Sequence, residues 1–225
     1  ATSDTPTLKI GDQVDILLNF DNTVKLANGN IIVTFNTTNT AGTATVTPAS
    51  GDQTLTATYT VLEGESTARL DVSSVALDPD DGDVTLTDNP TYAADNSTHK
   101  PNNIDEANGF TPVTDFITGG WNIAVDGVYP FISNMTSDTD NGTYGIGDVI
   151  SVTVNFNEEV TSNNTLEIPF GLTSNISFAA ITTAATSATA TYTVVENDNV
   201  AALDVTSAAV NNGTIVDAAG NELQT

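Results

Sequence analysis

The sequence of 225 residues contains no cysteine, one histidine, one tryptophan and four lysine or arginine residues. Without cysteine, no disulfide can crosslink the fold and no thiol can act as a nucleophile or a metal ligand. No apolar run approaches the roughly 18–20 residues that a membrane-spanning helix needs, so membrane insertion is not expected. Residues 1–7 lack the charged and apolar regions of a signal peptide, and we expect any export signal to be removed or to lie outside this chain.

Positive charge is scarce, because 29 Asp and Glu residues stand against 4 Lys and Arg residues and give a formal net charge of −25. So acidic a surface repels phosphate backbones and anionic lipid headgroups, which argues against nucleic acid and membrane surfaces as partners. It favours cations instead. Asp supplies 21 of the acids, and its short carboxylate suits the binding of a hard metal close to the backbone. A salt-adapted, solvated surface is the alternative explanation.

Residues typical of catalysis are equally scarce. The single histidine, His99, lies in a polar stretch beside Lys100, and no Gly-x-Ser-x-Gly nucleophile motif occurs. Pairs of carboxylates, which glycosidases use, carry no information in a chain with this many acids. The sequence therefore predicts no catalytic residue and favours a protein that is not an enzyme.

Apolar and polar residues alternate repeatedly along the chain, as in residues 14–20, 55–61, 150–156 and 190–194. A period of two with β-branched and aromatic residues is typical of half-buried strands. Turn formers such as Asn141-Gly142 and Asn212-Gly213 separate the alternating segments, and no stretch has a convincing helical period. The pattern predicts an all-β fold of antiparallel β-sandwiches.

Two long segments of the first half recur in the second half. "LKIGDQVDILLNF" (residues 8–20) corresponds to "YGIGDVISVTVNF" (residues 144–156), and "TATYTVLEGESTARLDVSS" (residues 56–74) to "TATYTVVENDNVAALDVTS" (residues 189–207). Such self-similarity indicates two consecutive units of one fold. We place the first unit at residues 1–127, with a loop insertion at about 78–103, and the second unit at residues 128–225.

The second unit is expected to lack its final strand. After "DEANG" the first unit continues through "FTPVTDFITGGWNIAVDG", which we interpret as its closing strands, whereas only "ELQT" follows "DAAGN" in the second unit. Either the chain is a fragment of a longer array, or a strand from a neighbouring molecule completes the unit.

The succession "VDGVYPFISNMTSDTDNGTYGIGDVISVTVNFNEEV", "ATYTVVENDNVAALDVTS" and "NNGTIVDAAGN" resembles the tandem Ig-like and cadherin-like repeats of giant bacterial surface adhesins, of the RTX and biofilm-associated protein type. The resemblance covers nearly all of the second unit and the first unit more loosely. It implies two tandem antiparallel Ig-like or cadherin-like β-sandwiches with Ca²⁺ in loops and at unit junctions. It also implies an extracellular or cell-surface location and a role as a rigid extender or ligand-binding segment, with neighbouring repeats or subunits as partners.

Oxygen-rich side chains near the expected strand ends are the candidate calcium ligands, since Ca²⁺ takes about six to eight oxygens and alternate loops of a sandwich converge at one end. The candidates are Asp126, Asp138, Asp140, Asp148, Glu158, Glu159, Asp204 and Asp217, together with Asp4, Asp12, Asp71 and Asp105 in the first unit. The resemblance to adhesin repeats points to Asp126, Glu159 and Asp217 as ligands of a junction site. No loop fits the EF-hand pattern, and a turn or cap role is the alternative for any single Asp.

Two aromatic residues are candidates for binding surface glycans. Trp121 follows two glycines, and Tyr92 lies in the insertion; an exposed aromatic ring can stack on a sugar. Core packing is the alternative for Trp121, because Trp121, Ile123 and Val125 alternate like one face of a strand. Besides the adhesin segment, two other functions therefore stay open: a filament or surface-layer subunit completed by donor-strand exchange, and a carbohydrate-binding module.

Overall fold

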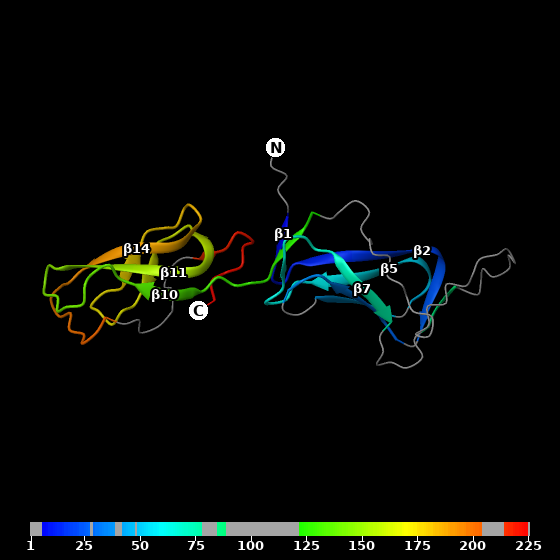
Figure 1. Ribbon diagram of the computed structural model, residues 1–225, viewed down its shortest axis with the longest axis horizontal. Helices are drawn as coiled ribbons and strands as arrows, with labels where there is room; N and C mark the ends of the chain where they lie inside the picture. Colours follow the sequence, from blue (N-terminus) through cyan, green and yellow to red (C-terminus); the bar gives the residue numbers. More distant parts are fainter. Residues whose placement is uncertain are drawn as a thin grey trace. The chain divides into compact units, whose positions relative to one another are not determined.

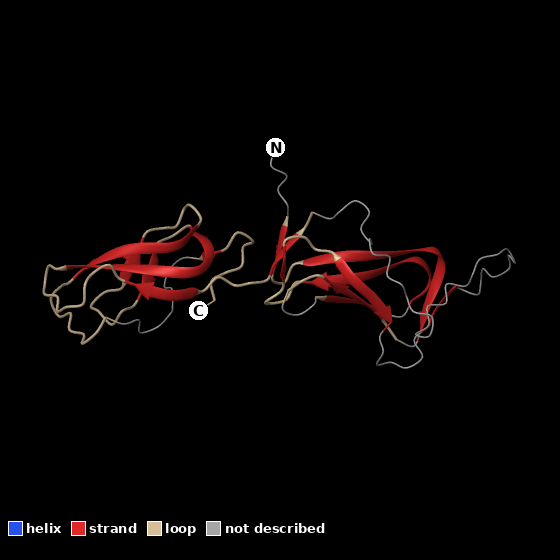
Figure 2. Ribbon diagram, in the orientation of Figure 1, coloured by secondary structure: helices blue, strands red, loops and turns tan. Residues whose placement is uncertain are grey.

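The computed structural model of the chain describes residues 6–27, 29–38, 42–47, 49–77, 85–88, 122–203 and 214–224. Within these ranges every regular element is a β-strand (Figure 2). The same ranges contain no helix long and apolar enough to cross a membrane. The prediction of an all-β chain with antiparallel sheets is confirmed.

The chain divides into two compact units, Ala1–Val128 and Tyr129–Thr225 (Figure 1). The boundary lies one residue away from the position that the repeat indicates. Each unit has its own apolar core and its own set of sheets.

The first unit contains three sheets among its described residues. Its strands are β1 (Thr7–Lys9), β2 (Gln13–Ala27), β3 (Ile31–Phe35), β4 (Thr43–Val46), β5 (Ala49–Thr60), β6 (Ser66–Thr67), β7 (Val72–Leu77), β8 (Thr85–Asp88) and β9 (Ala124–Asp126). Two sheets are antiparallel, with strand orders β5-β2-β8 and β4-β3-β7. In the third sheet, β9 lies between β1, to which it is parallel, and β6, to which it is antiparallel.

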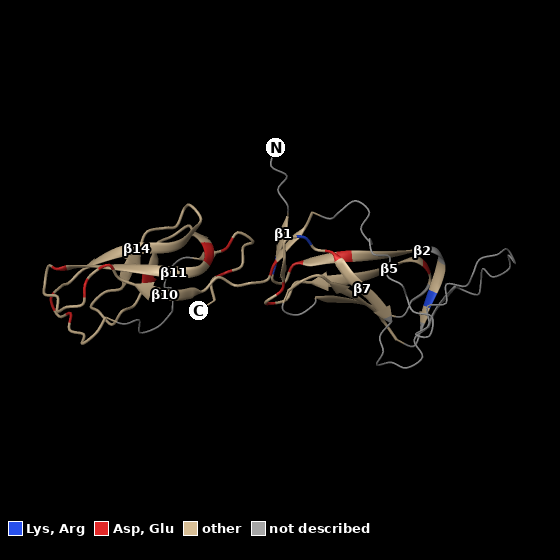
Figure 3. Ribbon diagram, viewed as in Figure 1, with Lys and Arg blue, Asp and Glu red and all other residues tan. Residues whose placement is uncertain are grey.

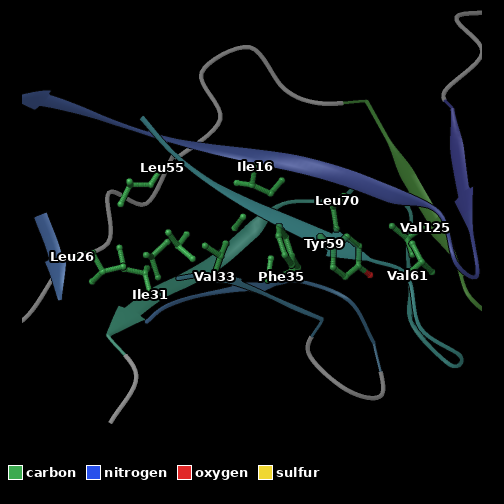
Figure 4. Close-up of a cluster of buried hydrophobic side chains, with 14 of the residues drawn as sticks. Ile16, Leu26, Ile31, Val33, Phe35, Leu55, Tyr59, Val61, Leu70 and Val125 are labelled. Carbon is green, nitrogen blue, oxygen red and sulfur yellow. The ribbon is translucent and has the colours of Figure 1, made fainter. Parts of the chain in front are cut away.

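The core of the first unit takes side chains from both antiparallel sheets (Figure 4). Alternate residues of β3 are buried, as the period-two pattern requires, and the rings of Phe35 and Tyr59 pack with their centroids 4.6 Å apart. Val125 of the third sheet joins the same cluster and is only 3 % exposed. The small sheet therefore closes one part of this core.

The predicted insertion at residues 78–103 contains strand β8, which pairs antiparallel with β2 from Val24↔Asp88 to Ala27↔Thr85. The rest of the insertion lies outside the described residues. Strand β8 thus extends the sheet that contains β2 at its edge. The polar composition of the segment did not indicate a strand here.

The second unit has two sheets and fewer strands among its described residues. They are β10 (Ile132–Thr136), β11 (Val149–Ser162), β12 (Leu166–Ile168), β13 (Ile176–Phe178), β14 (Ala185–Thr193) and β15 (Ile215–Val216). One sheet has the order β10-β11-β14 with β15 added to β11, and β12 pairs with β13 in the other. Val154, Leu166 and Phe178 are fully buried in a core to which both sheets contribute.

Candidate functional site

The same turn precedes the long strand of each unit. Gly11 and Gly147 have φ values of 86° and 92°, a left-handed conformation that glycine adopts at little cost. One oxygen of Asp12 accepts a hydrogen bond from the Lys9 N–H at 3.0 Å, and one oxygen of Asp148 accepts one from the Gly145 N–H at 2.7 Å. Both carboxylates therefore cap a turn, and their assignment as calcium ligands stays a prediction.

A buried tyrosine–carboxylate pair stabilises the turn at residues 62–65 of the first unit. The Tyr59 hydroxyl donates a hydrogen bond to Glu65 Oε2 at 2.7 Å, and the Leu62 N–H donates to the same oxygen at 2.9 Å. Glu65 is 1 % exposed. Burial, followed by the hydrogen bond and the negative charge of Glu65, raises the pKa of Tyr59 well above its ordinary value. A Cβ on Gly42 would lie 2.7 Å from the Tyr59 ring, so this pair leaves room for glycine only.

The second unit has the corresponding pair. The Tyr192 hydroxyl donates to Asp198 Oδ2 at 2.8 Å, the Val195 N–H donates to the same oxygen at 2.9 Å, and the Thr173 N–H donates to Asp198 Oδ1 at 2.8 Å. Hydrogen bonds from Thr173, Val195 and Tyr192 to the ionised form hold the pKa of Asp198 well below its ordinary range. The two units are thus built with the same turn chemistry.

Sequence reasoning missed Glu65 and Asp198, although the repeat carried the signal. In "YTVLEGE" and "YTVVEND" an acid stands six residues after a tyrosine, and the residue before the acid is Gly64 or Asn197. Those two residues have φ values of 84° and 75°, so both adopt the left-handed conformation that Gly and Asn tolerate best. An acid at the same turn position of both repeats indicates a side chain with a fixed partner.

Acidification is expected to destabilise the second unit through Asp198. Its folded-state pKa lies below the unfolded value of about 3.9, so the ionised carboxylate stabilises the fold above that pH. The contribution disappears as the pH falls toward the folded-state pKa. Urea unfolding between pH 6 and pH 2 should show a smaller loss of stability in Asp198→Asn than in the wild type. An Asp138→Asn control, at an exposed side chain, should behave as the wild type; equal pH profiles for all three proteins would contradict this role.

Two acidic side chains of the second unit approach each other where β11 pairs with β15. One carboxylate oxygen of Glu158 and one of Asp217 lie within 4.8 Å of each other. Glu158 belongs to β11, and Asp217 directly follows β15, which pairs with β11 at Thr161↔Val216. The strand pairing therefore brings together two acids that are far apart in the sequence. Figure 3 shows the acidic residues in the described parts of both units.

Asp217 is held rigidly in its own loop and is 4 % exposed. Its Oδ1 accepts hydrogen bonds from the N–H groups of Gly220 at 2.6 Å and Asn221 at 2.9 Å, and its Oδ2 accepts one from Asn221 Nδ2 at 2.8 Å. A carboxylate has about four lone-pair positions, so these three bonds leave acceptor capacity for a cation. The loop therefore fixes a buried negative charge beside Glu158.

Glu159 lies on the opposite face of β11 from Glu158 and is exposed, whereas Glu158 is half-buried. Glu158 Oε1 also accepts a hydrogen bond from Asn157 Nδ2 at 2.9 Å. Of the two neighbouring glutamates, it is thus Glu158 that lies beside Asp217.

The other candidate ligands belong to other segments of the chain or lie outside the described residues. Asp138 and Asp140 are exposed in the loop after β10, and an oxygen of Asp71 accepts a hydrogen bond from the Val72 N–H at 2.9 Å. In the first unit, Asp126 Oδ1 accepts a hydrogen bond from the Val128 N–H at 3.2 Å. Asp4, Asp105, Asp204, Tyr92, Trp121 and His99 lie outside the described residues.

Comparisons with protein-family models, with curated proteins and with solved structures give no match. The function is therefore inferred from the residues of the chain itself.

Proposed function

We propose that the chain is a calcium-stabilised extender segment of an extracellular bacterial adhesin, made of tandem Ig-like β-sandwich units. The approach of Glu158 to Asp217 carries this proposal. Further support comes from the repeated turns, which make each unit a copy of one module, and from the large excess of acids over bases. Neighbouring units of the same kind are the proposed partners.

The spacing of the pair suits two ligands of one ion. Ca²⁺–oxygen distances are about 2.3–2.6 Å, so two oxygens on one Ca²⁺ lie at most about 5 Å apart. Without a cation, two carboxylates within 4.8 Å of each other repel, and the burial of Asp217 weakens solvent screening of that repulsion. A bound Ca²⁺ removes the repulsion and thereby stabilises the β11–β15 edge of the second unit. Backbone carbonyls and water would complete the coordination.

Calcium titration by isothermal calorimetry tests this site. The wild type is expected to bind Ca²⁺ with a Kd of about 10⁻⁴–10⁻³ M, typical of extracellular modules. Glu158→Gln and Asp217→Asn should each weaken the binding at least about tenfold, because each removes a charged ligand, while Glu159→Gln should leave it unchanged. An Asp126→Asn variant tests the expectation that Asp126 is a further ligand.

Circular dichroism first establishes that each variant is folded, which matters most for Asp217→Asn because the side chain is buried. Glu158 is half-buried on a strand, so Glu158→Gln is the variant on which the result depends. If Glu158→Gln and Glu159→Gln bind calcium as tightly as the wild type, the ion lies elsewhere and this site is wrong. If the wild type binds no calcium, the adhesin proposal loses its main support.

A further inference from the structure

The closing strand of the first unit, β9, has a defined position between β1 and β6. Strand β9 pairs with β1 from Thr7↔Ala124 to Lys9↔Asp126 and with β6 at Ser66↔Asp126 and Thr67↔Val125. The Val125 side chain enters the core cluster that also contains Val61 and Leu70 (Figure 4). The strand thus supplies both backbone pairing and an apolar side chain.

In the second unit, no strand among the described residues occupies the position equivalent to that of β9. By the repeat, β1 corresponds to residues 143–145 and β6 to residues 199–200, and neither segment is a strand or is paired with one. A cleft of about 540 Å³ lies there instead, and its lining includes Tyr144, Val194, Val200 and Leu203. Val194 and Leu203 correspond to Val61 and Leu70, so the cleft occupies the place that β9 fills in the first unit. Val200 is 39 % exposed.

The backbone groups that would pair with a closing strand also lack partners among the described residues of the second unit. In the first unit the N–H groups of Leu70 and Gly64 donate to the carbonyls of Ile123 and Gly127, and the Gly127 N–H donates to the Glu65 carbonyl, all at 2.7 Å. The corresponding groups are the N–H groups of Leu203 and Asn197 and the carbonyl of Asp198. None of these three has a hydrogen-bond partner among the described residues.

A strand in this position also needs glycine at the residue that packs against the turn. A Cβ on Gly127 would lie 2.3 Å from the Leu62 carbonyl oxygen and 2.7 Å from the Glu65 carbonyl oxygen, both backbone atoms. The turn at residues 195–198 has the same carboxylate-capped form as the turn at residues 62–65. A strand bound in the cleft therefore also needs glycine where it packs against the turn at residues 195–198.

We infer that the cleft of the second unit is an acceptor groove for an added β-strand with the chemistry of residues 122–127 of the first unit. The strand carries an apolar side chain that fills the space between Val194 and Leu203, then a polar residue, then glycine. It pairs in parallel with residues 143–145 and antiparallel with residues 199–200, which is strand addition at an open sheet edge. The inference rests on the equivalence of the two repeats and is independent of calcium.

A labelled peptide with the sequence of residues 122–128, NIAVDGV, tests the groove by fluorescence anisotropy against the full chain. Saturable binding is expected, with at least about a tenfold loss for the peptides NIAVDAV and NIADDGV, which lack the glycine and the apolar residue. On the protein, Val200→Lys should weaken the binding, while Val149→Lys, at a 54 % exposed position outside the cleft lining, should not. Hydrogen exchange should show new protection at residues 143–145 and 199–203.

Three results would overturn the inference: no saturable binding, equal binding of NIAVDGV and NIAVDAV, or protection confined to the first unit. Sedimentation of the chain alone shows whether a second copy supplies the strand. If the chain self-associates and Val200→Lys abolishes the association, the added strand comes from a second copy of the chain, which supports the groove as a strand acceptor. All measurements are made both in Ca²⁺ and in EDTA, so that failure of the strand groove is distinguishable from failure of the calcium site.

Discussion

The Glu65→Ala variant is expected to destabilise the first unit by about 2–4 kcal/mol. The change leaves two donors without their acceptor, the buried Tyr59 hydroxyl and the partly buried Leu62 N–H, and each such loss costs about 1–3 kcal/mol. It also leaves space beside the Tyr59 ring, which is fully buried. The turn before β6 should therefore open first.

Hydrogen exchange followed by mass spectrometry measures this effect unit by unit. Peptides from residues 49–77 should exchange faster in Glu65→Ala, while peptides from residues 149–193 should be unchanged. Glu63→Ala is the matched control, because Glu63 lies two residues away in the same turn and is exposed. Equal protection in Glu65→Ala and Glu63→Ala would show that the tyrosine–carboxylate pair contributes nothing to stability.

Gly127→Ala is expected to destabilise the first unit by about 1–3 kcal/mol or more, the usual cost of forcing an extra methyl group into a packed position. The reason is the contact of the new Cβ with two backbone carbonyl oxygens, those of Leu62 and Glu65, which cannot move aside as a flexible side chain can. Strand β9 must shift away from the turn, and Val125 would be pulled from the core with it.

Gly145→Ala is the control for Gly127→Ala, because the nearest atom to its Cβ, Asp148 Oδ2, would be at an ordinary 3.8 Å. Where the backbone accepts alanine, such a change alters stability by no more than about 1 kcal/mol. Urea unfolding should therefore separate the two variants clearly. A Gly127→Ala protein as stable as the wild type would mean that β9 is not held closely against the turn.

Much of the fold could be predicted from the sequence because its signals are local. The alternation in residues 150–156 gave β11 with Val152, Val154 and Phe156 buried, as the structure has them. The paired Gly-Asp turns follow equally from short-range chemistry. Continued through β11, the same alternation places Glu158 on the side of Phe156 and Glu159 on the opposite side, so the choice between these two acids was within reach of the sequence.

The remaining features of the fold and of the candidate site depend on contacts between residues that are far apart in the sequence. The approach of Asp217 to Glu158 requires the pairing of β15 with β11, and no local pattern specifies which strands become neighbours. The addition of β8 to the edge of β2 is likewise set by tertiary pairing, within a segment whose Asp, Asn and Pro content favours loops. The burial of Glu65 depends on Tyr59 folding over it, which single-residue polarity does not predict.

Thermal unfolding of the full chain in 5 mM CaCl₂ and in excess EDTA, at physiological salt, tests the calcium proposal most directly. Calcium that binds only the folded state raises its stability by mass action, so the Tm is expected to fall in EDTA, and Mg²⁺ should not restore it. Glu158→Gln should remove most of the difference, and Glu159→Gln should retain it. An identical Tm in calcium and in EDTA would contradict the account and leave the acidity of the chain as an adaptation to solvent and salt.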